Sequence, residues 1–353
     1  MSRQRILVAD NSATYRKMFT RAVAELDSDA VITCVADVDE ALVKIKRHDY
    51  EIIVFDSEVS ESDMLLKEIT SQIPKAYVLI TSRPSNAGDK ICAEALAKGA
   101  ADYLIKPIFS SYDENYDAVK NKLASIFTIL DSKRRKPASQ SGSDKIARIA
   151  TVDKIRFLPE IVLIAASTGG PLALETILSK LSKNFPLPIL IVQHLLLQFT
   201  ETLANNLDQK SLLSVKVAEN NETILAGKVY IAPGGVHMKL GADGRIRLDG
   251  SPPINGVRPA ADALFESVAE SFPGNGVLVV ILTGMGRDGA NGLKKLKEKQ
   301  DCLCIAQSEE TSVVYGMPRV VVESGLADKI LDLDKITSEI ESLSQIKSSG
   351  KGV

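Results

Sequence analysis

Ser167 stands at a position where a protein could use a serine as a nucleophile. The apolar residues 161–166 predict a buried strand that leads directly into a Ser-Thr-Gly-Gly turn beginning at Ser167, and Pro171 is favoured at the first position of a helix. A serine on such a turn lies beside the N–H groups of the helix N-terminus, and these donors can stabilise an oxyanion. The same segment also suits a helix N-cap or a phosphate-binding turn, so Ser167 alone does not predict a hydrolase.

A serine nucleophile needs a base, and the chain has three histidines. His194 follows the apolar run 188–192, so it ends a predicted strand at the same sheet edge as Ser167. His237 follows a Pro-Gly-Gly turn and could lie near that edge, whereas His48 lies in a polar stretch and is expected to be solvated. We favour His194 as the base because the strand end fixes its position.

Asp288 completes a Ser-His-Asp triad. The apolar run 277–282 predicts a strand that ends in a glycine-rich loop, which places Asp288 at a third strand end. A carboxylate behind the imidazole would orient it and stabilise its charged form. The N–H of Met285 or Gly286 could donate to an oxyanion. The chain order of the three residues and the absence of a Gly-x-Ser-x-Gly motif do not imply an α/β-hydrolase fold.

The loop at 284–289 also permits a different interpretation. It reads Gly-x-Gly-x-x-Gly between a strand and a helix, and Glu309 and Glu310 follow roughly 20 residues later, as in a dinucleotide site. In such a site Asp288 would repel the pyrophosphate, and Ser167 and His194 would have no role. Dinucleotide binding is therefore the weaker alternative.

Four polar residues stand at predicted strand ends in the first half of the chain: Asp10, Asp56, Thr81 and Lys106. Ligands of open parallel sheets gather at the carboxyl ends of the strands. The carboxylates of Asp10 and Asp56 suit a divalent cation such as Mg²⁺, and Thr81 and Lys106 suit the oxygens of an incoming phosphoryl group. The set predicts a phosphoryl-accepting pocket.

Strand and helix alternate in both halves, which predicts two α/β domains with parallel sheets and helices on both faces. In the first half we expect strands at 5–9, 31–35, 52–55, 76–80 and 102–105, and helices at 13–26, 38–46, 88–98 and 117–130. In the second half we expect strands at 161–165, 188–192, 228–232, 277–282 and 303–306, helices at 171–181, 260–271 and 291–299, and a hairpin joining 236–240 to 245–248. The chain thus divides into a domain at 1–130, a polar linker at 131–158, a domain at 159–345 and a flexible tail at 346–353.

The overall composition excludes several classes of protein. The 353 residues are 45% hydrophobic and 25% charged, with a formal net charge of -2, so there is no electrostatic basis for binding nucleic acid. We see no leader segment and no apolar run of the roughly 20 residues that a membrane helix needs. We therefore expect a cytoplasmic protein without membrane insertion. The four scattered cysteines are expected to be buried thiols.

Residues 4–125 resemble the receiver domain of bacterial two-component response regulators. The resemblance rests on the run that ends at Asp10, on Asp56, on Thr81 and the serine after it, and on residues 101–107. It implies a flavodoxin-like fold in which Asp56 accepts a phosphoryl group from a histidine kinase, with Mg²⁺ bound. The family usually has a second acid after the first strand. Here it is Asn11, which binds Mg²⁺ more weakly because it is uncharged.

Residues 160–335 resemble the catalytic domain of the chemotaxis protein-glutamate methylesterases, the CheB family. Six segments in the family's order carry the resemblance: 166–170, 192–194, 229–235, 258–262, 282–290 and 314–318. The receiver, linker and esterase order is also that of the family. The second domain is therefore expected to be a Rossmann-like, doubly wound esterase domain.

The resemblance implies a serine hydrolase that removes γ-methyl esters from glutamates of methyl-accepting chemoreceptors, releases methanol and also deamidates receptor glutamines. Ser167 would be the nucleophile, His194 the base and Asp288 its orienting partner. Met285 would supply an oxyanion-hole N–H, with Thr168 nearby. The esterase would need no cofactor, and the receiver would cover the active-site face until it is phosphorylated. A non-enzymatic receptor-binding regulator built on a degenerate hydrolase is the remaining alternative.

Overall fold

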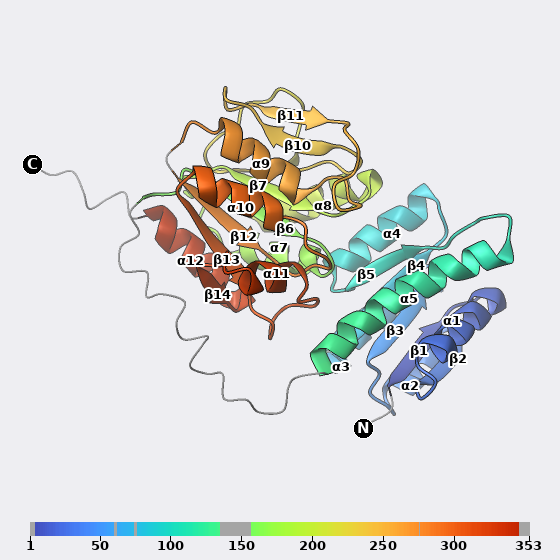
Figure 1. The fold of residues 1–353 in the computed structure, drawn as a ribbon. Coiled ribbons are helices and arrows are strands. Elements are labelled where there is room, and N and C mark those ends of the chain that lie inside the picture. Colours follow the sequence, from blue (N-terminus) through green and yellow to red (C-terminus); the bar gives the residue numbers. More distant parts are fainter. Residues whose placement is uncertain (1–3, 60–61, 74–75, 135–156, 275, 346–353) are drawn as a thin grey trace, which may run out of the picture. The chain divides into compact units, whose positions relative to one another are not determined.

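The computed structural model describes residues 4–59, 62–73, 76–134, 157–274 and 276–345. They belong to two compact units, Met1–Ser139 and Gln140–Val353 (Figure 1). The expected tail at 346–353 and most of the expected linker at 131–158 lie outside the described residues. The first residues of that linker are helical, because the last helix of the first unit continues to Arg134.

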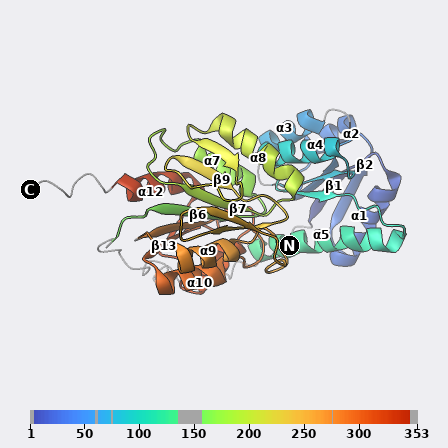
Figure 2. The same cartoon turned by 90° about the horizontal axis from the view of Figure 1, so that it is seen from above.

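The first unit is a five-stranded parallel sheet in the order β2-β1-β3-β4-β5, the flavodoxin-like order that was expected. The strands are β1 (Arg5–Ala9), β2 (Val31–Val35), β3 (Ile52–Asp56), β4 (Tyr77–Ser82) and β5 (Asp102–Ile105). The helices are α1 (Ala13–Leu26), α2 (Val38–Ile45), α3 (Ser62–Gln72), α4 (Asn86–Ala97) and α5 (Tyr112–Arg134). Helices α1 and α5 pack together on one face, and α2, α3 and α4 lie on the other (Figure 2).

The apolar runs of this unit form its central strands because a parallel sheet covered on both faces buries every side chain. All five residues of β3 and all six of β4 are buried. The predicted elements are confirmed, with ends that shift by a few residues. Helix α3 was not predicted; its buried side chains Leu65, Leu66 and Ile69 show that it has one apolar face.

The second unit holds a seven-stranded parallel sheet in the order β14-β13-β12-β6-β7-β9-β8. Its strands are β6 (Ile161–Ala166), β7 (Ile189–Gln193), β8 (Ser214–Val217), β9 (Lys228–Ile231), β12 (Val277–Ile281), β13 (Cys302–Gln307) and β14 (Lys329–Leu331). The predicted hairpin is β10 (His237–Leu240) paired with β11 (Ile246–Asp249), which packs beside α9 (Figure 1).

Helices cover both faces of this sheet. They are α7 (Gly170–Leu178), α8 (Leu197–Lys210), α9 (Ala261–Ser271), α10 (Ala290–Lys299), α11 (Met317–Glu323) and α12 (Leu333–Gln345). Helices α7, α8 and α12 lie on one face, and α9 and α10 on the other (Figure 2). Alternate residues of β6 serve the two cores: Leu163 packs with the side of α9 and α10, and Ile164 with the side of α7 and α8.

The chain path through this sheet reverses at β6. From β6 the chain passes to β7, then to β8 at the edge and back to β9 between them, and it later adds β12, β13 and β14 on the other side of β6. Ligands of doubly wound sheets bind at such a reversal, outside the carboxyl ends of the strands. The carboxyl ends of β6, β7 and β12 are therefore the expected position of a functional site.

Candidate active site

The residues that follow β6, β7 and β12 are brought together by the register of these strands. Ala166 at the end of β6 is opposite Gln193 at the end of β7, and the N–H of His194 donates to the carbonyl of Ala166 over 3.1 Å. On the other side, the N–H of Ser167 donates to the carbonyl of Thr283 over 3.0 Å. Ser167 and His194 thus leave the sheet at adjacent positions, as the sequence predicted.

His194 and Asp288 form a hydrogen-bonded pair. The imidazole Nε2 lies 2.8 Å from Asp288 Oδ2, with the His194 side chain 11% exposed and that of Asp288 3%. Because Nε2 faces the carboxylate, Nδ1 is the ring nitrogen left to take a proton. Among the described residues, no hydrogen bond joins His194 to the Ser167 hydroxyl. Such bonds are often long without substrate and tighten in the reacting complex.

Asp288 is held by the N-terminus of α9 as well as by His194. Its Oδ2 accepts the N–H of Ala261 over 2.6 Å, and its Oδ1 accepts the N–H of Asp262 over 3.2 Å. Burial alone would raise the pKa of Asp288. The hydrogen bonds from His194 and from the two amides outweigh burial and hold that pKa below its usual value of 3.8. The buried carboxylate is therefore ionised and fixed in orientation.

The turn that carries Ser167 is tightly packed. Gly169 has a φ of +77°, and a Cβ there would lie 2.6 Å from Cβ of Val313, so only glycine suits the position. The Thr283 hydroxyl donates to the carbonyl of Thr168 over 2.9 Å and accepts the N–H of Val314 over 2.9 Å. Thr283 thus connects the serine turn to the loop at 313–316.

Gln193 supports the same turn and was not predicted as a site residue. Its Nε2 donates to the carbonyl of Ser167 over 2.9 Å and to that of His194 over 3.3 Å. A Cβ at Gly170 would collide with Gln193 Oε1. The Gln193 side chain therefore connects the backbone of the nucleophile to that of the base. The position of Gln193 at the end of β7 is the signal that could have identified it.

The loop at 282–289 brings the backbone of Met285 close to the serine. A Cβ at Gly284 would lie 2.8 Å from Ser167 Cβ, so this loop runs directly against the serine. The carbonyl of Gly284 accepts the N–H of Gly316 over 3.1 Å and that of Met317 over 2.8 Å. Within the described part of the chain, the N–H of Met285 makes no hydrogen bond, so it is available to an oxyanion. Its side chain is exposed.

Asn255 and Asp262 are two further residues that sequence reasoning missed. The Asn255 amide donates to Asp262 Oδ2 over 2.9 Å and lies 3.4 Å from Asp288 Oδ1. An Asn-Gly turn and an acid in the first turn of a helix are ordinary signals of local structure, and neither points to a site.

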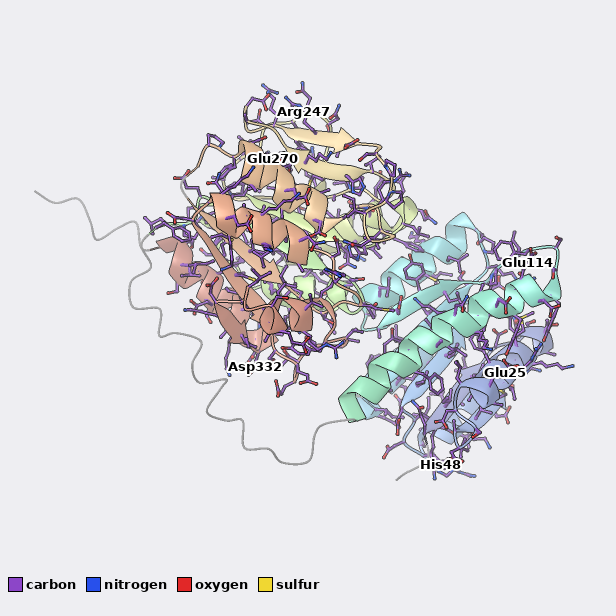
Figure 3. The ribbon with its side chains drawn as sticks, in the orientation of Figure 1. Glu25, His48, Glu114, Arg247, Glu270 and Asp332 are labelled. Carbon is purple, nitrogen blue, oxygen red and sulfur yellow. The ribbon has the colours of Figure 1, made fainter. Side chains whose placement is uncertain are left out.

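His237 and His48, the other two histidines of the chain, do not contact Asp288. His237 is fully buried, accepts the N–H of Ala260 at Nδ1 over 3.1 Å and contacts the carbonyl of Pro252 at Nε2 over 3.1 Å. It is a hydrogen-bonded structural residue. His48 is exposed on the surface of the first unit, where it contacts Tyr50 edge to face (Figure 3).

The glycine-rich loop favours the triad over a dinucleotide site. Asp288 does not stand among free amides; its carboxylate is already bound by His194 and by the start of α9. Gly286 and Gly289 have φ values of +87° and +91°, which serve the bends of the loop.

The four polar strand ends of the first unit converge, as predicted. Lys106 Nζ lies 2.9 Å from Asp10 Oδ2 and 2.6 Å from Asp56 Oδ2, and all three side chains are buried. Burial raises the pKa of Asp10 above 3.8, against the lowering effect of Lys106. The hydroxyl of Thr81 faces the carbonyl of Phe55 over 3.5 Å, beside Asp56.

The oxygen donors of this pocket fit a divalent cation. Two carboxylates are the hard ligands that Mg²⁺ prefers. Asp10 Oδ2 is buried and in ion-pair contact with Lys106, yet it accepts no aligned hydrogen bond, so it keeps lone pairs for a metal. Asn11, next to Asp10, is exposed. Among the described residues, no group of three or more His, Cys, Asp or Glu side chains is arranged around a metal ion.

Comparisons with known proteins assign families to both halves. The model of the CheB methylesterase family matches residues 162–340, and that of the response regulator receiver domain matches residues 6–114. A protein-glutamate methylesterase/protein-glutamine glutaminase of Syntrophomonas wolfei is 37% identical over 355 residues, which cover 97% of this chain and 100% of the relative. One from Desulfotalea psychrophila is 38% identical, over 96% of this chain and 98% of the relative.

Among solved structures, the CheB methylesterase catalytic domain of Thermotoga maritima is similar to the second unit. It is 45% identical with a TM-score of 0.50, and the match covers 53% of this chain and all of that domain. In the described part of this chain, no helix is both long enough and apolar enough to cross a membrane.

Proposed function

Because this chain belongs to the CheB methylesterase family, with a response regulator receiver domain ahead of the catalytic domain, we propose that it hydrolyses glutamate γ-methyl esters of chemoreceptors and releases methanol. It also deamidates receptor glutamines, in line with the double name of its relatives. The observation that carries the proposal is the hydrogen-bonded His194–Asp288 pair beside the Ser167 turn. As a chemotaxis enzyme, it acts in the cytoplasm.

The geometry supports a two-step mechanism. Ser167 Oγ attacks the carbonyl carbon of the ester, and its proton passes to Nδ1 of His194. Asp288 at Nε2 stabilises the imidazolium, which then gives its proton to the leaving methoxide. Water next attacks the acyl-enzyme while His194 takes its proton, and His194 then gives that proton to Ser167 Oγ as the glutamate carboxyl group is released. With a glutamine substrate the leaving group is ammonia.

The developing oxyanion needs preorganised donors. The N–H of Met285 serves this purpose, because it makes no hydrogen bond within the described chain and follows Gly284, which lies against Ser167. The backbone of Thr168 is the other candidate, because it directly follows the nucleophile and its carbonyl is fixed by Thr283. The esterase step uses these residues alone and requires no cofactor.

The receiver controls the esterase through Asp56. Asp56 accepts a phosphoryl group from a histidine kinase, and Thr81 and Lys106 hold the phosphoryl oxygens. Asp10 and Asp56 would hold Mg²⁺, with Asn11 as a weaker neighbour than a carboxylate. When bound, the cation neutralises charge on the incoming phosphoryl group. The Lys106 ammonium already contacts the carboxylates of Asp10 and Asp56, so it is positioned to move when phosphorylation changes the charge at Asp56.

Methanol release from methylated receptor tests the esterase. We expect release by the wild-type chain and loss of release in Ser167→Ala, whereas Ser338→Ala, which removes an exposed hydroxyl on α12, keeps it. Full release by Ser167→Ala refutes the nucleophile. Receptor binding without release by the wild type favours a non-enzymatic regulator.

Phosphodonor labelling tests the receiver. We expect Asp56→Ala to lose the label and the activation of methanol release, whereas Asp39→Ala, an exposed carboxyl in the first turn of α2, keeps both. Equal labelling of Asp56→Ala and wild type contradicts the phosphoacceptor assignment.

A further inference from the structure

Asp262 is a buried charge that the mechanism above does not use. It lies in the first turn of α9 and is 1% exposed. Its Oδ1 accepts the N–H of Gly292 over 2.7 Å and its Oδ2 accepts the amide of Asn255 over 2.9 Å. Burial and the charge of Asp288 raise the pKa of Asp262 above 3.8, whereas the hydrogen bonds from Gly292 and Asn255 favour its carboxylate form. A buried carboxylate is costly and needs such partners.

Asn255 stands between this carboxylate and that of Asp288. Its Nδ2 has two hydrogens, and its two neighbours are Asp262 Oδ2 and Asp288 Oδ1. Both neighbours are acceptors, which fixes the orientation of the amide. The backbone of Asn255 has a φ of +53° in a turn closed by hydrogen bonds in both directions between Ile254 and Val257. Asparagine is one of the few residues besides glycine that adopts this conformation readily.

The charges around Asp288 come from several elements. His194 follows β7, Asp262 and Glu266 belong to α9, Arg287 precedes Asp288, and Lys295 belongs to α10. Glu266 pairs with Lys295 over 2.8 Å, and the exposed Arg287 contacts Asn291. No described cation forms an ion pair with Asp262. Lys295 interacts electrostatically with Asp262 but forms its ion pair with Glu266, so the charge of Asp262 is only partly offset where it acts on the His194–Asp288 pair.

We propose that Asn255 and Asp262 are positioning residues for the hydrolytic reaction: Asn255 holds the two carboxylates apart and in orientation, and the charge of Asp262 strengthens His194 as a base. The inference rests on the proposed role of Asp288 as the acid behind His194. Asp262 also donates its own N–H to Asp288 Oδ1, so Asn255 and Asp262 together hold the carboxylate of Asp288 in its orientation. A negative charge here favours the imidazolium that forms when His194 takes the serine proton.

The pH profile of kcat/KM separates this role from a structural one. Asp262→Asn removes one negative charge, so the acid limb of the profile shifts to lower pH by about half a unit to one unit. Asn255→Gly keeps the positive φ but removes the amide, and kcat falls roughly 10- to 100-fold, the loss expected for a hydrogen bond to a charged group.

A matched control and a second readout keep the test decisive. Among the described residues, Asn221 is the other non-glycine residue with a positive φ, 68°. It is exposed and its N–H donates to the carbonyl of Ile246 in β11, so Asn221→Gly should leave kcat/KM and its pH profile unchanged. The chain has three histidines, so ring NMR can follow the titration of His194 in each folded variant, whether or not the variant is active. The titration midpoint of His194 should be lower in Asp262→Asn than in the wild type, as the acid limb is.

The outcomes distinguish the inference from the proposed function. If the wild type releases no methanol, the function fails, and the NMR titration still tests the coupling. If the wild type is active and the titration midpoint of His194 in Asp262→Asn equals that of the wild type or lies above it, the inference is wrong.

Discussion

Gly316 is the position where a single methyl group should disable the reaction without touching a reacting residue. A Cβ at Gly316 would lie 2.6 Å from the carbonyl oxygen of Gly284, 3.1 Å from the nitrogen of Gly286 and 3.2 Å from Cα of Met285. All three are backbone atoms, so no flexible side chain can yield. Gly316 itself has a φ of -102°, which alanine adopts, so the effect is one of close approach only.

The size of the effect follows from these distances. Restoring ordinary contact with Gly284 moves the loop by about 0.8 Å, and an oxyanion donor is effective only within roughly 2.7–3.1 Å of the oxygen. We therefore expect Gly316→Ala to lower kcat about 100-fold, near the loss for one oxyanion-hole donor, with little change in KM. Crowding of the packed loop should also lower the free energy of unfolding by about 1–3 kcal/mol.

Steady-state methanol release and thermal unfolding test this prediction together. Gly250→Ala is the matched control, because a Cβ at Gly250 meets no atom within 4 Å, and we expect wild-type values for it. If Gly316→Ala keeps kcat within twofold of the wild type, the N–H of Met285 is not the oxyanion donor or the loop adapts freely, and the reasoning fails.

Three further predictions concern charged groups. Asp288→Asn should lower kcat about 10³–10⁴-fold in the methanol assay, because the amide cannot stabilise the imidazolium, and wild-type kcat would contradict the triad. A hydrogen bond from Lys120, with a further one from Arg21, lowers the pKa of Glu25 from 4.5 to about 2. This depressed folded-state pKa means that the contribution of Glu25 to stability is present above pH 4.5 and is lost as the pH falls toward 2, so the Tm deficit of Glu25→Gln at pH 7 should vanish near pH 2. Asn11→Asp should bind Mg²⁺ more tightly in a metal titration and accelerate phosphodonor labelling, and unchanged affinity would exclude residue 11 as a ligand.

The sequence predicted the interior of both sheets well, because buried parallel strands are continuous apolar runs. Residues 161–166 and 277–282 are continuous apolar runs that predict buried strands, and they form β6 and β12. The edge strands differ from one another. β2 and β5 were predicted although they are only partly buried, whereas β8 and β14 are short, carry lysines among their apolar residues and were not predicted. The unpredicted helices α8 and α12 mix polar residues through their apolar faces.

The residues of the active site also divide into those that the sequence predicted and those that it did not. Ser167 and His194 were predictable because each directly follows a strand, and Asp288 because it lies in the loop that joins β12 to α10 at the same sheet edge. Asn255 lies in a turn that no strand positions, and it reaches Asp288 only because the start of α9 is folded back onto the loop after β12. Nothing in the spacing of the sequence specifies that contact.

The two carboxylate sites of this chain solve the problem of a buried negative charge with different partners. Asp288 is bound by backbone N–H groups at the start of α9, which cannot leave without unfolding the helix. Asp56 is bound at Oδ2 by the ammonium of Lys106, a flexible side chain that can follow a new negative charge. The first arrangement suits a carboxylate that must keep one charge and one orientation through every turnover. The second suits a carboxylate that is itself chemically modified, so the position of Lys106 should report the state of Asp56.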